Sequence, residues 1–157
     1  MDDMIRKMKK TEYPLLNDFL YEAIHIPQDA EAPPRSIINN PELQVYVEQF
    51  GRGRADYALA AEVDSKIVGA VWVRIMNDYG HIDEKTPSLA ISLYKPYRGL
   101  GIGTALMEAM LSLLKGKGYE SVSLSVQQAN AAVRMYQRLG FQIVDENEEE
   151  YLMVKEL

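Results

Sequence analysis

The clearest chemical signal in the sequence is a turn of alternating glycines beside an arginine, Arg98-Gly99-Leu100-Gly101-Ile102-Gly103-Thr104. It stands between a segment with strand-like alternation and the most regular helical pattern of the chain. Glycine allows the backbone to come close to a bulky anion without obstruction by a side chain. The free N–H groups and the dipole of a helix N-terminus attract such an anion, and the guanidinium adds a positive charge. The pattern therefore predicts a turn that holds phosphate groups.

Two common phosphate-binding loops do not fit this turn. A Walker A loop requires a lysine after its glycines, and no lysine follows these. A Rossmann turn has the spacing Gly-x-Gly-x-x-Gly, which would require a glycine in place of Thr104 or of Leu106. The strand before the turn also follows a predicted β-hairpin in the middle of the chain, instead of opening a βαβ unit. The turn therefore belongs to another class of anion site.

The composition excludes several classes of function. The 157 residues carry 17 Lys and Arg against 23 Asp and Glu, a formal net charge of -6, which argues against a non-specific nucleic-acid binder. The absence of cysteine excludes disulfides, thiolate metal sites and cysteine nucleophiles. His25 and His81 lie in separate predicted loops and do not suggest a metal site. No apolar run has the length of a membrane span. We expect a single domain over residues 1–157 that is cytoplasmic and binds no metal, nucleic acid or membrane.

Hydrophobic periodicity predicts an α+β domain, in which helices cover a sheet. The predicted strands cover residues 4–8, 57–63, 67–75, 88–94, 121–126, 142–144 and 151–154. The predicted helices cover residues 13–26, 41–50, 101–117 and 130–139. The third helix is the most regular, because apolar residues recur on one face from Ile102 to Leu114. This order places the glycine turn at the N-terminus of that helix.

Two segments together carry a resemblance to a known family. The segment Ile91-Ser92-Leu93-Tyr94-Lys95-Pro96-Tyr97-Arg98-Gly99-Leu100-Gly101-Ile102-Gly103 resembles the pyrophosphate-binding motif of the GNAT superfamily of N-acetyltransferases. The core of that motif, Arg/Gln-x-x-Gly-x-Gly/Ala, is matched by Arg98, Gly101 and Gly103. The segment Asn130-Ala131-Ala132-Val133-Arg134-Met135-Tyr136-Gln137-Arg138-Leu139-Gly140-Phe141 is similar to a second family motif, an Asn before an apolar helix with a Tyr and then Gly-Phe.

The resemblance implies a fold and a co-substrate. The fold would be a central mixed, mostly antiparallel sheet of about six or seven strands with about four flanking helices. The co-substrate would be acetyl-CoA, whose pyrophosphate the backbone amides of Gly99 to Thr104 would hold. The edge of the strand Ile91-Ser92-Leu93 would pair with the pantetheine arm as with an added strand. Asn130 and Tyr136 would complete the acetyl-CoA site.

The resemblance also implies a reaction, the direct attack of a primary amine of a small molecule or protein on the thioester. The backbone N–H of Leu93 would stabilise the oxyanion, and Tyr136 would protonate the departing thiolate as general acid. Without the family motif, Tyr136 would be interpreted as a core residue at helical spacing. Homodimers are common in the family, and the sequence leaves the oligomeric state open, as it does the length of the acyl group.

The sequence does not identify a base for the amine. The candidates are Glu62, Asp83, Glu84 and His25, each of which is also typical of a surface or structural residue, and a chain of water molecules would leave no residue to find. Two other functions stay open. The chain could be a non-catalytic acyl-CoA-binding or regulatory domain of the same fold, or a nucleotide- or phosphate-binding module of another fold.

Overall fold

The computed structural model describes residues 3–27, 29–76 and 82–157. The strands are β1 (Asp3–Lys7), β2 (Tyr57–Val63), β3 (Lys66–Arg74), β4 (Ser88–Leu93), β5 (Ser121–Gln127), β6 (Gln142–Glu146) and β7 (Glu150–Glu156). The α-helices are α1 (Leu16–Glu22), α2 (Pro41–Gln44), α3 (Ile102–Gly116) and α4 (Ala132–Arg138), and short 3₁₀ helices are η1 (Lys10–Leu15), η2 (Arg35–Asn39) and η3 (Lys95–Tyr97). The predicted α+β order of elements is confirmed.

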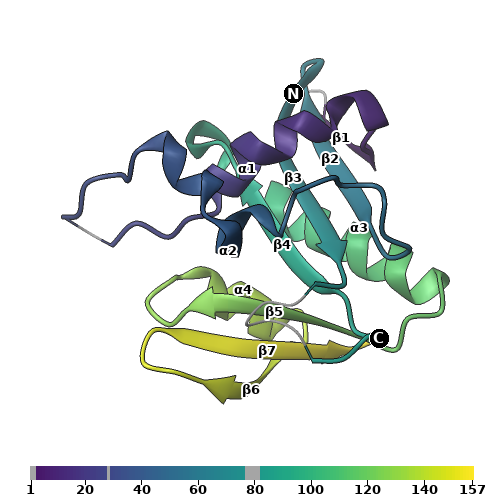
Figure 1. Ribbon diagram of the computed structural model, residues 1–157. Helices are drawn as coiled ribbons and strands as arrows, with labels where there is room; N and C mark the ends of the chain where they lie inside the picture. Colours follow the sequence, from purple (N-terminus) through teal and green to yellow (C-terminus); the bar gives the residue numbers. More distant parts are fainter. Residues whose placement is uncertain (1–2, 28, 77–81) are drawn as a thin grey trace.

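The strands form one seven-stranded sheet in the order β1-β2-β3-β4-β5-β7-β6 (Figure 1). Every neighbouring pair is antiparallel except β4 and β5, which are parallel and pair only at Ser88 and Ser123. There the N–H of Ser123 donates to the carbonyl of Pro87 over 3.0 Å. Beyond this point β4 and β5 diverge, and this divergence opens the sheet at its middle.

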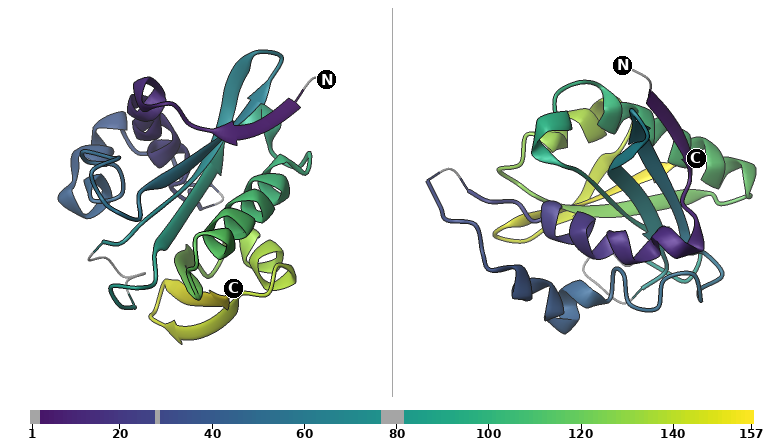
Figure 2. Two further views of the ribbon diagram at one scale, coloured as in Figure 1. Left: turned by 90° about the vertical axis from the view of Figure 1, so that its right-hand side faces the viewer. Right: turned by 90° about the horizontal axis from the view of Figure 1, so that it is seen from above.

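The helices cover both faces of the sheet (Figure 2). On one face, α3 buries Leu106, Met110 and Leu114 of the predicted apolar face, and it also buries Met107. On the other face, Phe19 of α1 packs with the buried Trp72 of β3. These two cores hold β4 from both sides. Among the described residues, no helix is both long enough and apolar enough to cross a membrane.

The first two helices are shorter than predicted. The predicted helix 13–26 divides into η1, which contains Pro14, and the short α1. The predicted helix 41–50 keeps only the four residues of α2. Side chains of β3 capture the carbonyl groups that a longer helix would use: Arg74 Nη1 donates to the carbonyls of Val45 and Glu48, over 3.0 and 2.9 Å. A tertiary contact therefore ends α2, and periodicity alone does not reveal it.

Candidate functional site

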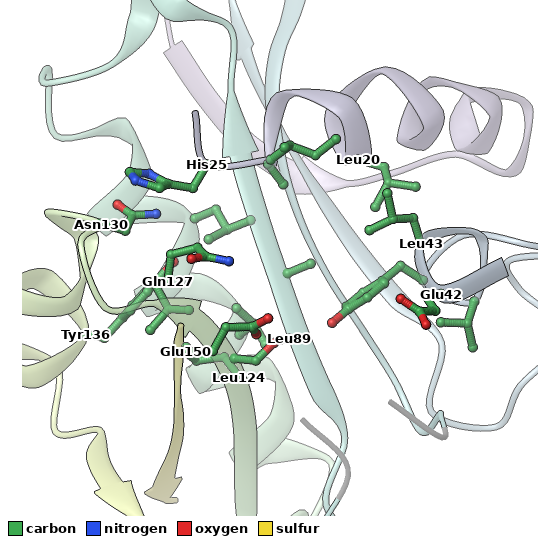
Figure 3. A pocket seen from close by; sticks show the side chains of 18 of the residues that line it. Leu20, His25, Glu42, Leu43, Leu89, Leu124, Gln127, Asn130, Tyr136 and Glu150 are labelled. Atoms are coloured by element: carbon green, nitrogen blue, oxygen red, sulfur yellow. The ribbon is translucent and has the colours of Figure 1, made fainter. Parts of the chain in front are cut away.

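A cavity of about 920 Å³ lies where β4 and β5 diverge. In Figure 3, Leu20, Glu42 and Leu43 lie on one wall, and Gln127, Asn130 and Tyr136 lie on the other, with β4 between them. The first wall comes from α1 and α2, and the second from β5 and α4. Of the predicted site residues, Ile91, Asn130 and Tyr136 line this cavity. The glycine turn does not line it and follows β4 along the chain.

The edge of β4 that faces the cavity has no strand beside it over most of its length. The N–H of Tyr94 donates to the carbonyl of Val68 over 3.0 Å, so the backbone groups of Tyr94 and Ser92 point toward β3. Because successive residues of a strand point their N–H and C=O groups to opposite sides, those of Ile91 and Leu93 point away from β3. The pairing with β5 ends at Ser88. Among the described residues, the N–H and C=O of Ile91 and the N–H of Leu93 therefore have no strand partner on this edge, whereas the carbonyl of Leu93 accepts from Arg98.

The side chain of Ser92 stabilises the packing of α1 against β4. Its hydroxyl donates to the carbonyl of Phe19 over 2.6 Å and so fastens α1 to β4.

Leu93 is held between two glycines. A Cβ atom on Gly69 would lie 2.2 Å from Cδ2 of Leu93, and one on Gly103 would lie 3.5 Å from Cδ1. Gly69 thus lets Leu93 lie close against β3, which fixes the direction of the Leu93 N–H.

The glycine turn has the geometry of an anion cradle. Gly99 and Gly101 have φ values of +76° and +86°, a conformation that side chains disfavour. Within the described part of the chain, no backbone N–H from Gly99 to Thr104 donates to an acceptor; the first helical bond runs from Ala105 to Gly101. A Cβ on Gly99 or Gly101 would meet no atom within 4 Å. Residues 99–101 are exposed, and the amides of the turn have no acceptor among the described residues, as an anion site requires.

Arg98 links the end of β4 to α1. Its Nε donates to the carbonyl of Leu93 over 2.9 Å, and its Nη2 donates to the carbonyl and the carboxylate of Glu22, over 3.2 and 3.1 Å. The sequence predicts a positive charge beside the glycine turn, and that charge is present. The structure adds that the guanidinium also holds the carbonyl of Leu93, in the peptide that joins Leu93 to Tyr94.

Replacement of Arg98 with lysine should lower kcat and not only raise the KM for acetyl-CoA. Lysine keeps the charge but cannot bridge Leu93 and Glu22 together. The loss of one hydrogen bond of about 1 kcal/mol predicts a decrease in kcat of about fivefold. Steady-state kinetics would measure both parameters, with Arg52→Lys as control, because Arg52 bonds only to the exposed Gln49. A change confined to the KM would contradict the positioning role.

Tyr136 is a buried phenol at the cavity wall. It is 8% exposed, and its ring packs edge-on against Phe141 with 6.0 Å between the centroids. Burial raises the pKa of Tyr136 to about 12, so the phenol stays protonated at neutral pH. Its hydroxyl makes no hydrogen bond to any described residue. A buried hydroxyl without a partner costs free energy of folding, which points to a ligand as its partner.

Asn130 orders the start of α4. Its Oδ1 accepts the N–H of Ala132 over 2.9 Å, and the helix begins two residues later than expected. Asn130 also lines the cavity together with Tyr136. Gly140, with φ of +101°, follows the C-terminus of the helix.

The candidate bases lie in different parts of the structure. Glu62 forms an ion pair with Arg6 over 3.1 Å and does not line the cavity. Asp83 and Glu84 line a different cavity of about 670 Å³. The N–H of Lys85 donates to Asp83 and lowers its pKa. His25 does line the main cavity, whereas His81 lies outside the described residues.

Sequence reasoning missed the acidic residues of the cavity, Glu42, Glu48 and Glu150. Glu42 and Glu48 belong to the segment of α2, and Glu150 begins β7 opposite Gln127. No motif marks them, because their positions depend on how β4 and β5 diverge. Within the described residues, no cluster of His, Asp or Glu could hold a metal ion.

Comparisons with known proteins agree with this geometry. The model of the acetyltransferase (GNAT) family matches residues 20–141. The chain is 33% identical over 127 residues to an N-alpha-acetyltransferase of Sulfurisphaera tokodaii, covering 71% of this chain and 75% of that protein. It is 32% identical over 112 residues to the probable N-acetyltransferase san of Drosophila melanogaster, covering 70% of this chain and 59% of the fly protein.

The fold also matches a solved structure. The crystal structure of PaiA N-acetyltransferase from Thermoplasma acidophilum in complex with coenzyme A superposes with a TM-score of 0.73 at 20% identity, with all of both chains covered. The predicted mostly antiparallel sheet with flanking helices is thereby confirmed. The family model spans most of the chain, including the glycine turn and Tyr136. The chain belongs to the acetyltransferase (GNAT) family.

Proposed function

We propose that the protein is an acetyl-CoA-dependent N-acetyltransferase, which transfers the acetyl group to a primary amine of a small molecule or protein by direct attack. One observation carries the proposal. The edge of β4 at Ile91 and the buried phenol of Tyr136, which has no hydrogen-bond partner among the described residues, line the same cavity, and the glycine turn with its unbonded amides follows β4 along the chain. A donor site for a phosphate-bearing thioester needs an anion cradle, a strand edge and a proton donor, and these segments supply all three.

The chain's own residues fit each part of acetyl-CoA. The amides from Gly99 to Thr104 would bind its pyrophosphate, because the turn presents N–H groups without other acceptors. The backbone of Ile91 would pair with the amide groups of the pantetheine arm. The N–H of Leu93, held by the contacts of Leu93 with Gly69 and of its carbonyl with Arg98, would donate to the thioester oxygen and stabilise the negative charge that develops there.

Tyr136 supplies the proton that the leaving group requires. As the amine nitrogen bonds to the acetyl carbon, the carbon–sulfur bond breaks and the sulfur takes the phenolic proton. The proton that the amine loses goes to solvent water, and solvent returns a proton to the Tyr136 phenolate. A thiol has an ordinary pKa of about 8.5, so transfer from a phenol with a pKa of about 12 is uphill. It becomes accessible in a buried site, which disfavours the thiolate.

The experiment incubates the protein with acetyl-CoA and a panel of amines. The panel contains small monoamines, diamines, amino acids and peptides with free N-termini. Thiol release and the mass of the acceptor are measured together. We expect thiol release that depends on the amine, with a product heavier by one acetyl group. Binding of acetyl-CoA without transfer to any amine would contradict catalysis and favour a non-catalytic acyl-CoA-binding domain.

A further inference from the structure

One wall of the cavity carries negative charge. Glu42 of α2 lines it, and so does Glu48, which follows that helix. Glu150 lines the cavity from β7 (Figure 3). The carboxylates of Glu42 and Glu48 make no ion pair or hydrogen bond with other described residues. Neither lysine nor arginine is among the described residues that line the cavity. The charges of Glu42 and Glu48 are therefore not neutralised by any described residue of the cavity lining.

The wall is held rigidly. Asn40 caps α2 by accepting the N–H of Glu42 over 3.0 Å. The carbonyl of Glu48 accepts from Arg74, which in turn forms a buried ion pair with Asp56 over 2.8 Å. Because their backbones are anchored in this way, the exposed carboxylates of Glu42 and Glu48 stay at this wall of the cavity. An ordered backbone lowers the entropic cost of recognising a ligand compared with a flexible loop.

A second observation marks the same cavity as a ligand site. Tyr136, on the wall opposite α2, is 8% exposed and has no hydrogen-bond partner among the described residues (Figure 3). In the proposed mechanism, Tyr136 is the proton donor, so the reaction takes place next to it, at the edge of β4 that diverges from β5. The acidic wall stands across the cavity from it. A volume of about 920 Å³ is larger than a reacting amine alone requires.

We propose that the acceptor is a small diamine or polyamine, and that Glu42 and Glu48 bind the positive charge that does not react. This inference rests on the proposed function. One amine of such a molecule lies at β4, and its second ammonium group pairs with the acidic wall. A monoamine would leave both carboxylates unpaired, and an anionic acceptor would be repelled.

The test compares putrescine and spermidine with butylamine, which has the same carbon chain as putrescine but one charge. We expect kcat/KM to be about tenfold higher for putrescine, because its second ammonium group pairs with carboxylates that butylamine leaves unpaired. The double variant Glu42→Gln/Glu48→Gln should lose this preference by raising the KM for putrescine, while butylamine kinetics stay unchanged. The matched control is Glu148→Gln/Glu149→Gln, which removes the same charge outside the cavity.

Three results would overturn the inference: equal kcat/KM for putrescine and butylamine, an equal effect of the double variant on both amines, or a peptide that exceeds every diamine. In each of these cases acetyl transfer still occurs, so the proposed function stands. The absence of transfer to any amine would overturn both. Loss of the putrescine preference as salt is added would support the ion pairs, because salt screens exposed charges.

Discussion

Replacement of Tyr136 with phenylalanine should lower kcat by about a hundredfold or more while leaving the affinity for acetyl-CoA nearly unchanged. The variant removes the proton donor for the thiolate and keeps the ring that packs on Phe141. It should also raise the thermal unfolding midpoint, because burying a hydroxyl without a partner costs about 1–3 kcal/mol. Steady-state kinetics and thermal unfolding measure the two effects. A gain in stability together with a loss in turnover distinguishes a functional tyrosine from a core residue.

The control for this substitution is Tyr119→Phe, which removes a hydroxyl in the separate cavity beside Tyr57. It should leave kcat unchanged. Because burial raises the pKa of Tyr136 to about 12, the acid form persists in alkaline solution, and kcat should not fall through loss of this proton below about pH 10. Full activity of the phenylalanine variant would remove the role of Tyr136.

The second large effect is expected at the glycine turn. Gly101→Ala should weaken acetyl-CoA binding by about tenfold, because an alanine at φ of +86° favours a different backbone conformation and the amides would turn from the anion. The strain itself should cost about 1 kcal/mol of stability. Titration calorimetry with acetyl-CoA measures the binding. At saturating acetyl-CoA, kcat should be largely retained, since Leu93 and Tyr136 are untouched.

Gly118 offers a matched control on the same helix. It has φ of +89° and open space around it, as Gly101 has, but it follows the C-terminus of α3. Gly118→Ala should therefore cost similar stability and leave acetyl-CoA binding unchanged. Equal affinities of the two variants for acetyl-CoA would show that the turn does not hold the pyrophosphate.

The sequence predicts the elements whose periodicity is a local property. The helix α3 and the β2–β3 hairpin lie close to their predicted bounds, because α3 buries a regular apolar face and the two strands are short, mostly buried apolar runs joined by a tight turn. The predicted helices 13–26 and 41–50 were too long. Arg74 binds the carbonyls of Val45 and Glu48, a contact between segments more than twenty residues apart that no local pattern encodes.

The site also combines features that local sequence patterns predict with features that only tertiary contacts create. Its motifs place the glycine turn and Tyr136 correctly relative to the secondary structure, because a motif is a run of neighbouring residues. The contact of Arg98 with Glu22 joins residues 76 positions apart. The acidic wall of Glu42 and Glu48 exists only because β4 and β5 diverge after Ser88. Sequence reasoning finds the local chemistry, and the tertiary structure decides which charges surround it.

The most direct test of the account is the shift of the thermal unfolding midpoint on addition of acetyl-CoA, compared with CoA, ATP and NAD at equal concentration. A ligand that binds only the folded state stabilises it by about 2.7 kcal/mol at a hundred times its Kd. We predict a clear rise with acetyl-CoA and none with NAD. No rise at millimolar acetyl-CoA would contradict the central claim, because the amides of the glycine turn and the free edge of β4 would then not form a donor site.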